Sequence, residues 1–196
     1  MRALRYGPVV LMCGALLACG GKGGGSDHPP GPPIPVPSFV CVDAAPATDR
    51  VVLRCAGKVA DDIWRIDVVA GVPTTSADIN GFRFDVTFDP QQLAFVPGSA
   101  DKGDLLDRDG QTVLFAAALD PNDAGRLIVG LNRTGGTGIR GQAPNDLIMS
   151  FCLRALTGAP FGPLAPAFEN ARADDSSLQA IPEIGFDNGT LFLSVE

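Results

Sequence analysis

The chain has 196 residues, a formal net charge of −7 and a pI of about 4.6. This acidic balance, with only three lysines, excludes the basic stripe that a nucleic-acid-binding surface needs. The single histidine, His28, lies in a proline-rich stretch, which excludes Ser-His-Asp and Cys-His catalytic sets and histidine-based metal clusters from the rest of the chain.

Residues 1–18 have the layout of a signal peptide. Two arginines precede an apolar segment, residues 8–18, that is too short to span a bilayer as a helix. A Leu-x-x-Cys pattern ending at Cys19 resembles a bacterial lipobox, which implies cleavage before Cys19 and its lipidation. Two or three acyl chains anchor a protein stably. By resemblance to the sorting rule of Gram-negative bacteria, Gly20 implies the outer membrane. The alternative is an ordinary cleaved signal with a chance cysteine.

Glycine and proline dominate residues 19–38, so this segment cannot bury enough apolar surface to offset its ordering entropy. We expect a disordered tether, flexible in its glycine-rich part and extended in its proline-rich part. The remaining residues, 39–196, fit one domain with a full hydrophobic core.

Beyond residue 50, apolar and polar residues alternate with a period of two, which predicts strands rather than helices. In the segment 81–89, one face carries Phe82, Phe84, Val86 and Phe88, and the other carries Arg83, Asp85 and Thr87. Turn signals separate this segment from further predicted strands at 63–71, 113–120, 126–132, 147–156 and 190–195. Many short strands with regular turns predict an all-β, antiparallel β-sandwich or barrel.

The order of these segments resembles the cohesin domain, a nine-stranded jelly-roll sandwich. The most specific match lies in residues 81–96 and comprises Gly81, Phe82, Phe84, Phe88, Asp89, Pro90, Leu93 and Phe95. The resemblance covers residues 50–196 and implies a jelly-roll β-sandwich of about nine strands. Residues 157–182, rich in proline and alanine, depart from it, and we expect an irregular loop with a short strand or turn there.

Cohesins bind dockerins, small calcium-binding modules of partner proteins, on one flat sheet face. The resemblance implies that strands 81–89, 113–120, 126–132 and 147–156 form this face. The alternation then predicts an outward set that is small and partly apolar: Arg83, Asp85, Thr87, Leu114, Ala116, Ala118, Ile128, Asn132, Ile148 and Ser150. Such a surface often marks an interface. The alternatives are cover by the 157–182 segment or the N-terminal strand, or a register slip of one residue.

Three cysteines follow Cys19, and an exported protein meets an oxidising environment, so one bridge is expected. Three single bridges are possible. We favour Cys41 with Cys55, because the segment around Pro46 can form a hairpin or loop, and this choice leaves Cys152 as a free thiol.

Four aspartates lie in residues 101–110, but their spacing is not that of an EF-hand, so an acidic surface loop is expected rather than a calcium site. We expect no metal, no cofactor and no catalytic residue. The sequence therefore predicts a non-catalytic lipoprotein of the bacterial cell envelope that binds an exported protein, dockerin-bearing or other. A polysaccharide-binding lipoprotein is the alternative, disfavoured by the scarcity of tryptophan and tyrosine for sugar stacking.

Overall fold

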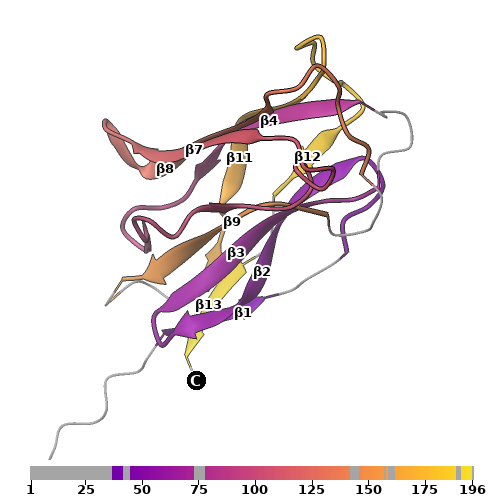
Figure 1. Cartoon of the computed structure of the whole chain (residues 1–196). Coiled ribbons are helices and arrows are strands. Elements are labelled where there is room, and N and C mark those ends of the chain that lie inside the picture. Colours follow the sequence, from indigo (N-terminus) through magenta and orange to yellow (C-terminus); the bar gives the residue numbers. More distant parts are fainter. Residues whose placement is uncertain are drawn as a thin grey trace, which may run out of the picture. The chain divides into compact units, whose positions relative to one another are not determined.

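The alternating segments form β-strands in the computed structural model, which describes residues 37–41, 45–72, 78–141, 146–156, 158, 162–188 and 191–195 (Figure 1). Thirteen strands and no helix lie within these residues. The predicted signal peptide, Cys19 and the tether up to residue 36 lie outside them. Over the described part of the chain, no helix has the length and hydrophobicity needed to cross a membrane.

One sheet has four antiparallel strands in the order β11-β4-β8-β7 (Figure 1). Its strands are β4 (Ile79–Thr87), β7 (Val113–Asp120), β8 (Asp123–Arg133) and β11 (Ala167–Asp175). A tight turn joins β7 to β8, and in it the backbone N–H of Asn122 donates to a carboxylate oxygen of Asp120 at 2.9 Å. This is the local bond by which an Asp-Pro-Asn sequence favours a turn.

A second sheet has the order β12-β2-β3-β9-β5, and β6 also pairs with β9. Its strands are β2 (Arg50–Ala60), β3 (Ile63–Ala70), β5 (Leu93–Phe95), β6 (Asp101–Lys102), β9 (Asp146–Ala155) and β12 (Gly185–Asp187). Its pairings are antiparallel except that β12 runs parallel to β2. The short strands β12 and β5 therefore end this sheet on its two sides.

A third, small sheet joins the two ends of the domain in the order β1-β13-β10. Its strands are β1 (Pro37–Cys41), β10 (Gly162–Leu164) and β13 (Leu191–Val195). β1 pairs with β13 antiparallel over its whole length.

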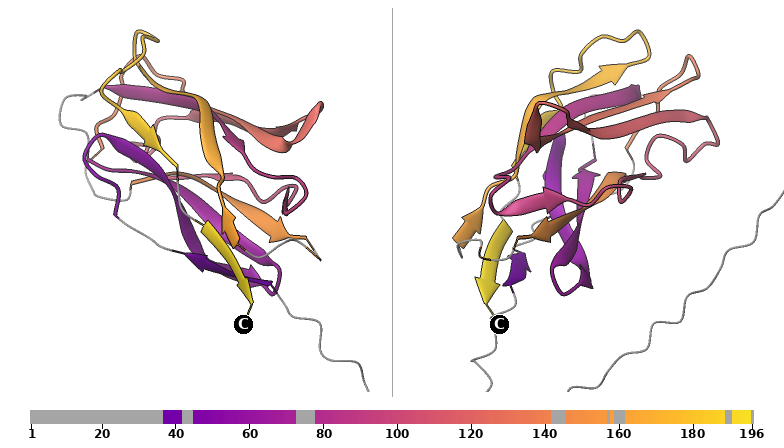
Figure 2. Two further views of the ribbon diagram at one scale, coloured as in Figure 1. Left: turned by 180° about the vertical axis from the view of Figure 1, so that it is seen from behind. Right: turned by 90° about the vertical axis from the view of Figure 1, so that its left-hand side faces the viewer.

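The hydrophobic core lies between the four-stranded and six-stranded sheets, which form two layers in Figure 2. On the four-stranded sheet, β4 and β8 contribute side chains that are at most 3% exposed: Phe82, Phe84, Val86, Leu127, Val129 and Leu131. On the other sheet, β3 and β9 contribute fully buried ones: Ile66, Val68, Met149, Phe151 and Leu153. The rings of Phe84, Phe168 and Phe186 join β4, β11 and β12, with centroids 5.3 to 6.2 Å apart. The unit Pro35–Glu196 contains this whole core.

The predicted β-sandwich is confirmed, and so is the inward face of segment 81–89. Two expectations about topology were wrong. The 147–156 strand, β9, lies between β3 and β5 in the six-stranded sheet and not beside β8. The 157–182 segment is not mainly an irregular loop, because it contains β10 and the whole nine-residue strand β11, which pairs with β4.

Candidate binding face

The outward side of the four-stranded sheet, here called the binding face, carries eight of the ten residues predicted for a partner surface. Strand register aligns the outward residues in rows across β11, β4, β8 and β7. One row contains Arg172, Arg83, Gly130 and Ala116, and the next contains Glu169, Asp85, Ile128 and Ala118. Leu114 is 64% exposed and Ile128 is 45% exposed, the largest apolar side chains on this face. The alternation had therefore predicted the outward phase of three strands correctly.

The other predicted residues on this face follow the same phase. Arg83, Ala116, Ala118 and Asn132 are exposed, and Asp85 and Thr87 are half-buried. The two half-buried residues lie toward β11, whose side chains cover part of β4. The hydroxyl of Thr87 donates to the backbone carbonyl of Ala167 on β11 at 3.3 Å.

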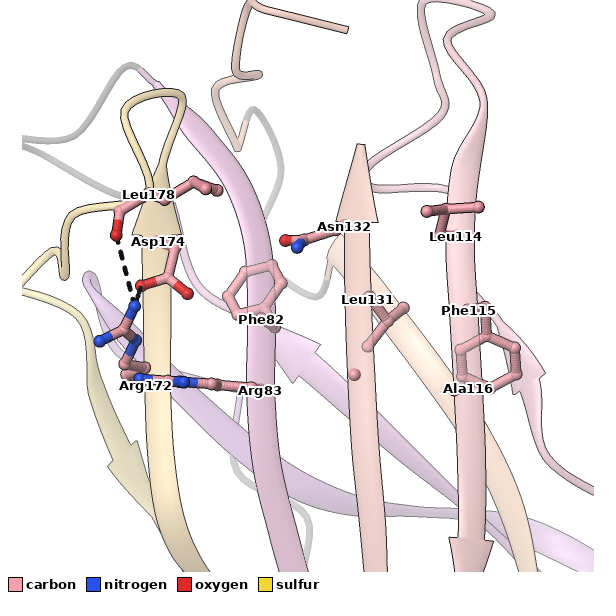
Figure 3. Close-up of a pocket in the computed structure, with 11 residues that line it drawn as sticks. Phe82, Arg83, Leu114, Phe115, Ala116, Leu131, Asn132, Arg172, Asp174 and Leu178 are labelled. Atoms are coloured by element: carbon pink, nitrogen blue, oxygen red, sulfur yellow. Dashed lines mark hydrogen bonds and ion pairs between the residues drawn. The ribbon is translucent and has the colours of Figure 1, made fainter. Parts of the chain in front are cut away.

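Gly130 opens a hollow of about 480 Å³ in one half of the binding face (Figure 3). A Cβ built at Gly130 would meet no atom within 4 Å, so the absence of a side chain there contributes to this space. Residues from all four strands and from the turn after β11 surround it; those that project outward are Arg83, Leu114, Ala116, Asn132, Arg172, Asp174 and Leu178. The hollow thus has aliphatic walls from Leu114 and Leu178 and a polar wall from arginines.

Packing on the binding face explains why a glycine, Gly81, begins segment 81–89. Gly81 of β4 lies opposite Asn132 of β8. A Cβ at Gly81 would come within 1.9 Å of the Asn132 side-chain oxygen and 2.6 Å of the Leu131 carbonyl oxygen. Only glycine lets the Asn132 side chain lie over β4 at the rim of the hollow.

The end of the binding face beyond Ile128 is acidic. Arg126 lies 2.8 Å from Asp85, 2.8 Å from Glu169 and 3.5 Å from Asp123, so one cation meets three carboxylates. Its hydrogen bond to Asp85 and the nearby Glu169 carboxylate raise the pKa of Arg126 above its ordinary value. The side-chain amide of Asn170 also donates to Asp85, at 2.7 Å.

The end with the hollow is basic. Arg172 forms an ion pair with Asp174 at 2.5 Å and donates to the backbone carbonyl of Leu178 at 3.4 Å (Figure 3). Arg83 projects beside them and makes no ion pair within the described residues. Two arginines and one aspartate therefore give this end a positive balance, although the chain as a whole carries −7.

The assignment of Ile148 and Ser150 to the partner surface was wrong. Both belong to β9 in the opposite sheet and are buried, at 1% and 8% exposure. The alternation fails there because the pairing of β3 with β9 shifts register between Val68 and Val69. In addition, the backbone N–H of Gly103 donates to the carbonyl of Ile148 at 2.8 Å, so the 103–105 segment lies along the edge of β9.

Sequence reasoning missed the contribution of β11, namely Glu169, Arg172 and Asp174, and the neighbouring Leu178. The pairing of β11 with β4 shifts register between Glu169 and Arg172, and Asn170 there has a left-handed backbone with φ of 50°. This irregularity removes the period-two pattern from the segment. The alternating charges from Glu169 to Asp175 were the one local sign of a solvent-facing strand.

Cys55 on β2 is disulfide-bonded. The side chain of Cys41 lies outside the described residues, so the pairing of Cys41 with Cys55 stays a prediction. Cys152 on β9 is a free, half-buried thiol.

The acidic loop 101–110 places two of its four aspartates in ion pairs. Lys102 pairs with Asp107, and Arg133 pairs with Asp109 at 2.6 Å. Across the described ranges, no group of three cysteine, histidine, aspartate or glutamate side chains is arranged to hold a metal ion. Two of its four carboxylates, those of Asp107 and Asp109, therefore act as structural partners of basic side chains.

Aromatic side chains face the core rather than solvent. Trp64 is 3% exposed, and Phe82, Phe84 and Phe151 are at most 2% exposed. None of the aromatic side chains whose burial the structure describes is exposed. The aromatic side chains of the described surface are therefore at most half-exposed, as Phe95, Phe115, Phe168 and Phe186 are.

Comparison with known proteins gives a likeness of fold. No family model matches the sequence, and no curated protein matches it. Among solved structures, the sixth cohesin of scaffoldin B of Acetivibrio cellulolyticus, in complex with a dockerin, is similar with a TM-score of 0.54 at 16% identity, over 72% of this chain and 95% of that one. A non-cellulosomal cohesin of the archaeon Archaeoglobus fulgidus is similar with a TM-score of 0.51 at 12% identity, over 72% and 87%.

A third similar structure is a cohesin–dockerin complex of Clostridium thermocellum, with a TM-score of 0.50 at 15% identity, over 76% of this chain and 95% of that one. The matches span nearly the whole of these cohesins, whereas the identities are too low to compare individual site residues. The predicted resemblance is thereby confirmed for the architecture, and the described domain has the cohesin fold.

Proposed function

We propose that the domain is a non-catalytic binding module that holds another exported protein against the binding face. The observation that carries the proposal is the make-up of this face: a flat centre of Ala116, Ala118 and Ile128, a hollow at Gly130, and ends of opposite charge. A small, partly apolar centre with a charged rim is the usual composition of a protein interface. The charged ends would orient the partner and select against wrong ones.

A dockerin-like partner is the favoured class. Two of the similar cohesins above were solved as complexes with dockerins, which supports this class without identifying the partner. The unequal charge of the two ends leads us to expect a partner with a basic group near Glu169 and an acidic group near Arg83.

The proposal also includes a cellular location for the module. Lipidation of Cys19 would anchor the chain to the bacterial envelope, in the outer membrane, and the glycine- and proline-rich segment would hold the domain away from the lipid. A module on such a tether can search for partners within the reach of the tether.

The test is affinity capture by immobilised domain, residues 35–196, from membrane and secreted fractions of the source organism, with and without a calcium chelator. The wild type is compared with Ile128→Arg, which puts a charge at the centre of the face, and with Gly130→Val, which puts an apolar side chain into the hollow at a position where a Cβ meets no atom within 4 Å. We expect each variant to weaken binding of the captured protein by roughly 30-fold or more, the size of a hot-spot loss.

Val59→Arg is the matched control, because Val59 is 62% exposed and lies on β2 of the opposite sheet. Retention by this control and loss with both face variants supports the proposal, and loss on chelation favours a dockerin-like partner. Undiminished capture by Ile128→Arg removes this face as the site. Retention of the domain on polysaccharide, with no protein captured, favours the alternative function.

A further inference from the structure

Strand β7 is a long, bare edge of the four-stranded sheet. Among the described residues, β7 pairs only with β8, and its other side has no strand beside it. Its residues 113–119 contain no charge, proline or glycine. Edge strands in soluble proteins are normally protected by features such as a charged residue or a proline, because an unprotected edge can pair with a strand of another chain.

The other long edge in this sheet, β11, is protected. Its pairing with β4 breaks register twice, and it carries Glu169, Arg172 and Asp174. The six-stranded sheet ends in β5 and β12, which have three residues each. Protection of these edges makes β7 the exception, because the first seven of its eight residues carry no charge.

The hydrogen-bond phase shows which groups of β7 face the free side. The backbone N–H of Thr134 donates to the carbonyl of Thr112 at 2.9 Å, and the register then runs unbroken to Leu119 opposite Leu127. Hydrogen-bonded and non-hydrogen-bonded pairs alternate in an antiparallel ladder. Residues 114, 116 and 118 therefore bond to β8, whereas residues 113, 115, 117 and 119 turn their N–H and C=O groups to the open edge.

The hydrophobic core is also less completely covered at β7 than at β8. The inward residues Phe115, Ala117 and Leu119 pack on the core but are only half-buried. Their neighbours on β8, Leu127, Val129 and Leu131, are at most 3% exposed. A strand added beside β7 would cover this apolar margin as well as the free backbone groups.

We propose that the strand added there is β7 of a second copy of this chain, paired antiparallel about a twofold axis at Ala116. In this register, all four residues that turn their backbone groups to the open edge find a partner in the other copy. Residue 113 pairs with 119 and residue 115 with 117, and each pair occurs twice because of the twofold axis. Large residues then lie opposite small ones: Phe115 faces Ala117, and Leu114 faces Ala118. Asp120 lies opposite Thr112, so the pair brings no like charges together.

The register centred on Ala117 fits less well. An axis at Ala117 would place residue 113 opposite Pro121, which has no N–H to donate, and leave three paired residues per strand instead of four. The Ala116 register joins the two four-stranded sheets into one and places both binding faces on the same side. The pairing does not depend on the proposed function, but it would give the dimer two binding faces, so a ligand with two binding elements would bind bivalently.

A cysteine cross-link on the full chain tests the axis. In the proposed pair, Ala116 faces Ala116 of the second copy at a non-hydrogen-bonded position, with Cα atoms roughly 4.5 Å apart, a separation that a disulfide can span. Ala118, equally exposed on the same strand, would lie roughly 14 Å from its own copy, at about 3.4 Å per residue. We expect Ala116→Cys to form a disulfide-linked dimer on mild oxidation and Ala118→Cys to remain at the level of the parent chain.

Ala117→Pro provides a second test, because the Ala117 N–H faces the open edge and its loss leaves the β8 ladder intact. The full chain in mild detergent should have the mass of a dimer by light scattering with the detergent subtracted, and Ala117→Pro should have the mass of a monomer. Equal cross-linking at 116 and 118, no cross-link at 116, a cross-link to a different protein, or a monomeric parent chain would each overturn the proposal.

Discussion

Arg133 is a buried cation at the end of β8, and its replacement tests whether it fastens the acidic loop to the sheet. Its side chain is fully buried and donates to both carboxylate oxygens of Asp109, at 2.6 and 3.0 Å, to the Thr137 carbonyl at 3.0 Å, and to the Leu106 carbonyl. Asp109 itself is 44% exposed at its side chain. Arg133→Met keeps most of the apolar stem and removes every one of these bonds.

The expected loss of stability follows from the polar groups that lose Arg133 as their hydrogen-bond donor. The Asp109 carboxylate can hydrate, whereas Leu106 is 2% exposed and its carbonyl loses a donor. A buried polar group without a partner costs about 1–3 kcal/mol, so we expect Arg133→Met to lower the free energy of unfolding by about 2 kcal/mol. With a urea dependence of about 1–3 kcal/mol per molar, the midpoint should fall by about 1 M.

Trp64, the only tryptophan and 3% exposed, reports unfolding by fluorescence. The matched control is Arg154→Met, because Arg154 pairs with Asp62 at 3.0 Å with both side chains nearly half exposed. Such a surface pair contributes about 0–1 kcal/mol. Equal midpoints for Arg133→Met and Arg154→Met would refute the structural role of the buried cation.

Acid provides an independent measurement of the same pair. The hydrogen bond from Arg133 holds the pKa of Asp109 below its ordinary value. A lowered folded-state pKa gives stability that is present above the unfolded-state pKa, about 4, and is lost as the pH falls through the folded-state value. Arg133→Met should therefore flatten the loss of stability below about pH 4, and an unchanged acid slope would contradict the pairing.

Two further predictions concern Asp78, which lies before β4 and bonds to the turn after β11, and the proposed lipid anchor. The Ser176 hydroxyl, with the backbone N–H groups of Gly138 and Ser176, lowers the pKa of Asp78, so Asp78→Asn should also flatten the acid limb of unfolding below about pH 4; an unchanged Trp64 fluorescence titration would contradict this. Cys19→Ala should abolish incorporation of labelled palmitate in growing cells and release the chain from the membrane fraction, and full labelling of this variant would exclude lipidation at Cys19.

The sequence alone was sufficient to predict which side chains are buried where a strand has one buried face and one solvent-exposed face. Phe82, Phe84 and Val86 alternate with Arg83 and Asp85, and the hydrophobic effect places the two sets on opposite sides whatever the neighbouring strand is. The same reasoning predicted the exposure of the outward residues of β7 and β8, because their inward partners also alternate strictly.

Sequence alone was insufficient where the structure depends on pairing between distant segments. β9 lies inside its sheet, between β3 on one side and β5, β6 and the 103–105 segment on the other. Ile148 and Met149 are buried in succession there, so the pattern of β9 does not identify its sheet. β11 carries a bulge at Asn170 that breaks its alternation. Each of these strands is specified by its partners, which single-strand periodicity does not identify.

The two roles inferred for β7 use different parts of the strand, which makes them separable. The binding face uses the side chains of Leu114, Ala116 and Ala118, whereas the edge uses the backbone groups of residues 113, 115, 117 and 119. Small side chains on the face keep the centre flat and also permit a close approach at the twofold axis. Ala117→Pro therefore removes the edge pairing and leaves the side chains of the binding face unchanged, whereas Ile128→Arg changes the binding face and leaves the edge unchanged. Loss of dimerisation alone in the first variant, and loss of partner binding alone in the second, would assign each role to its own surface.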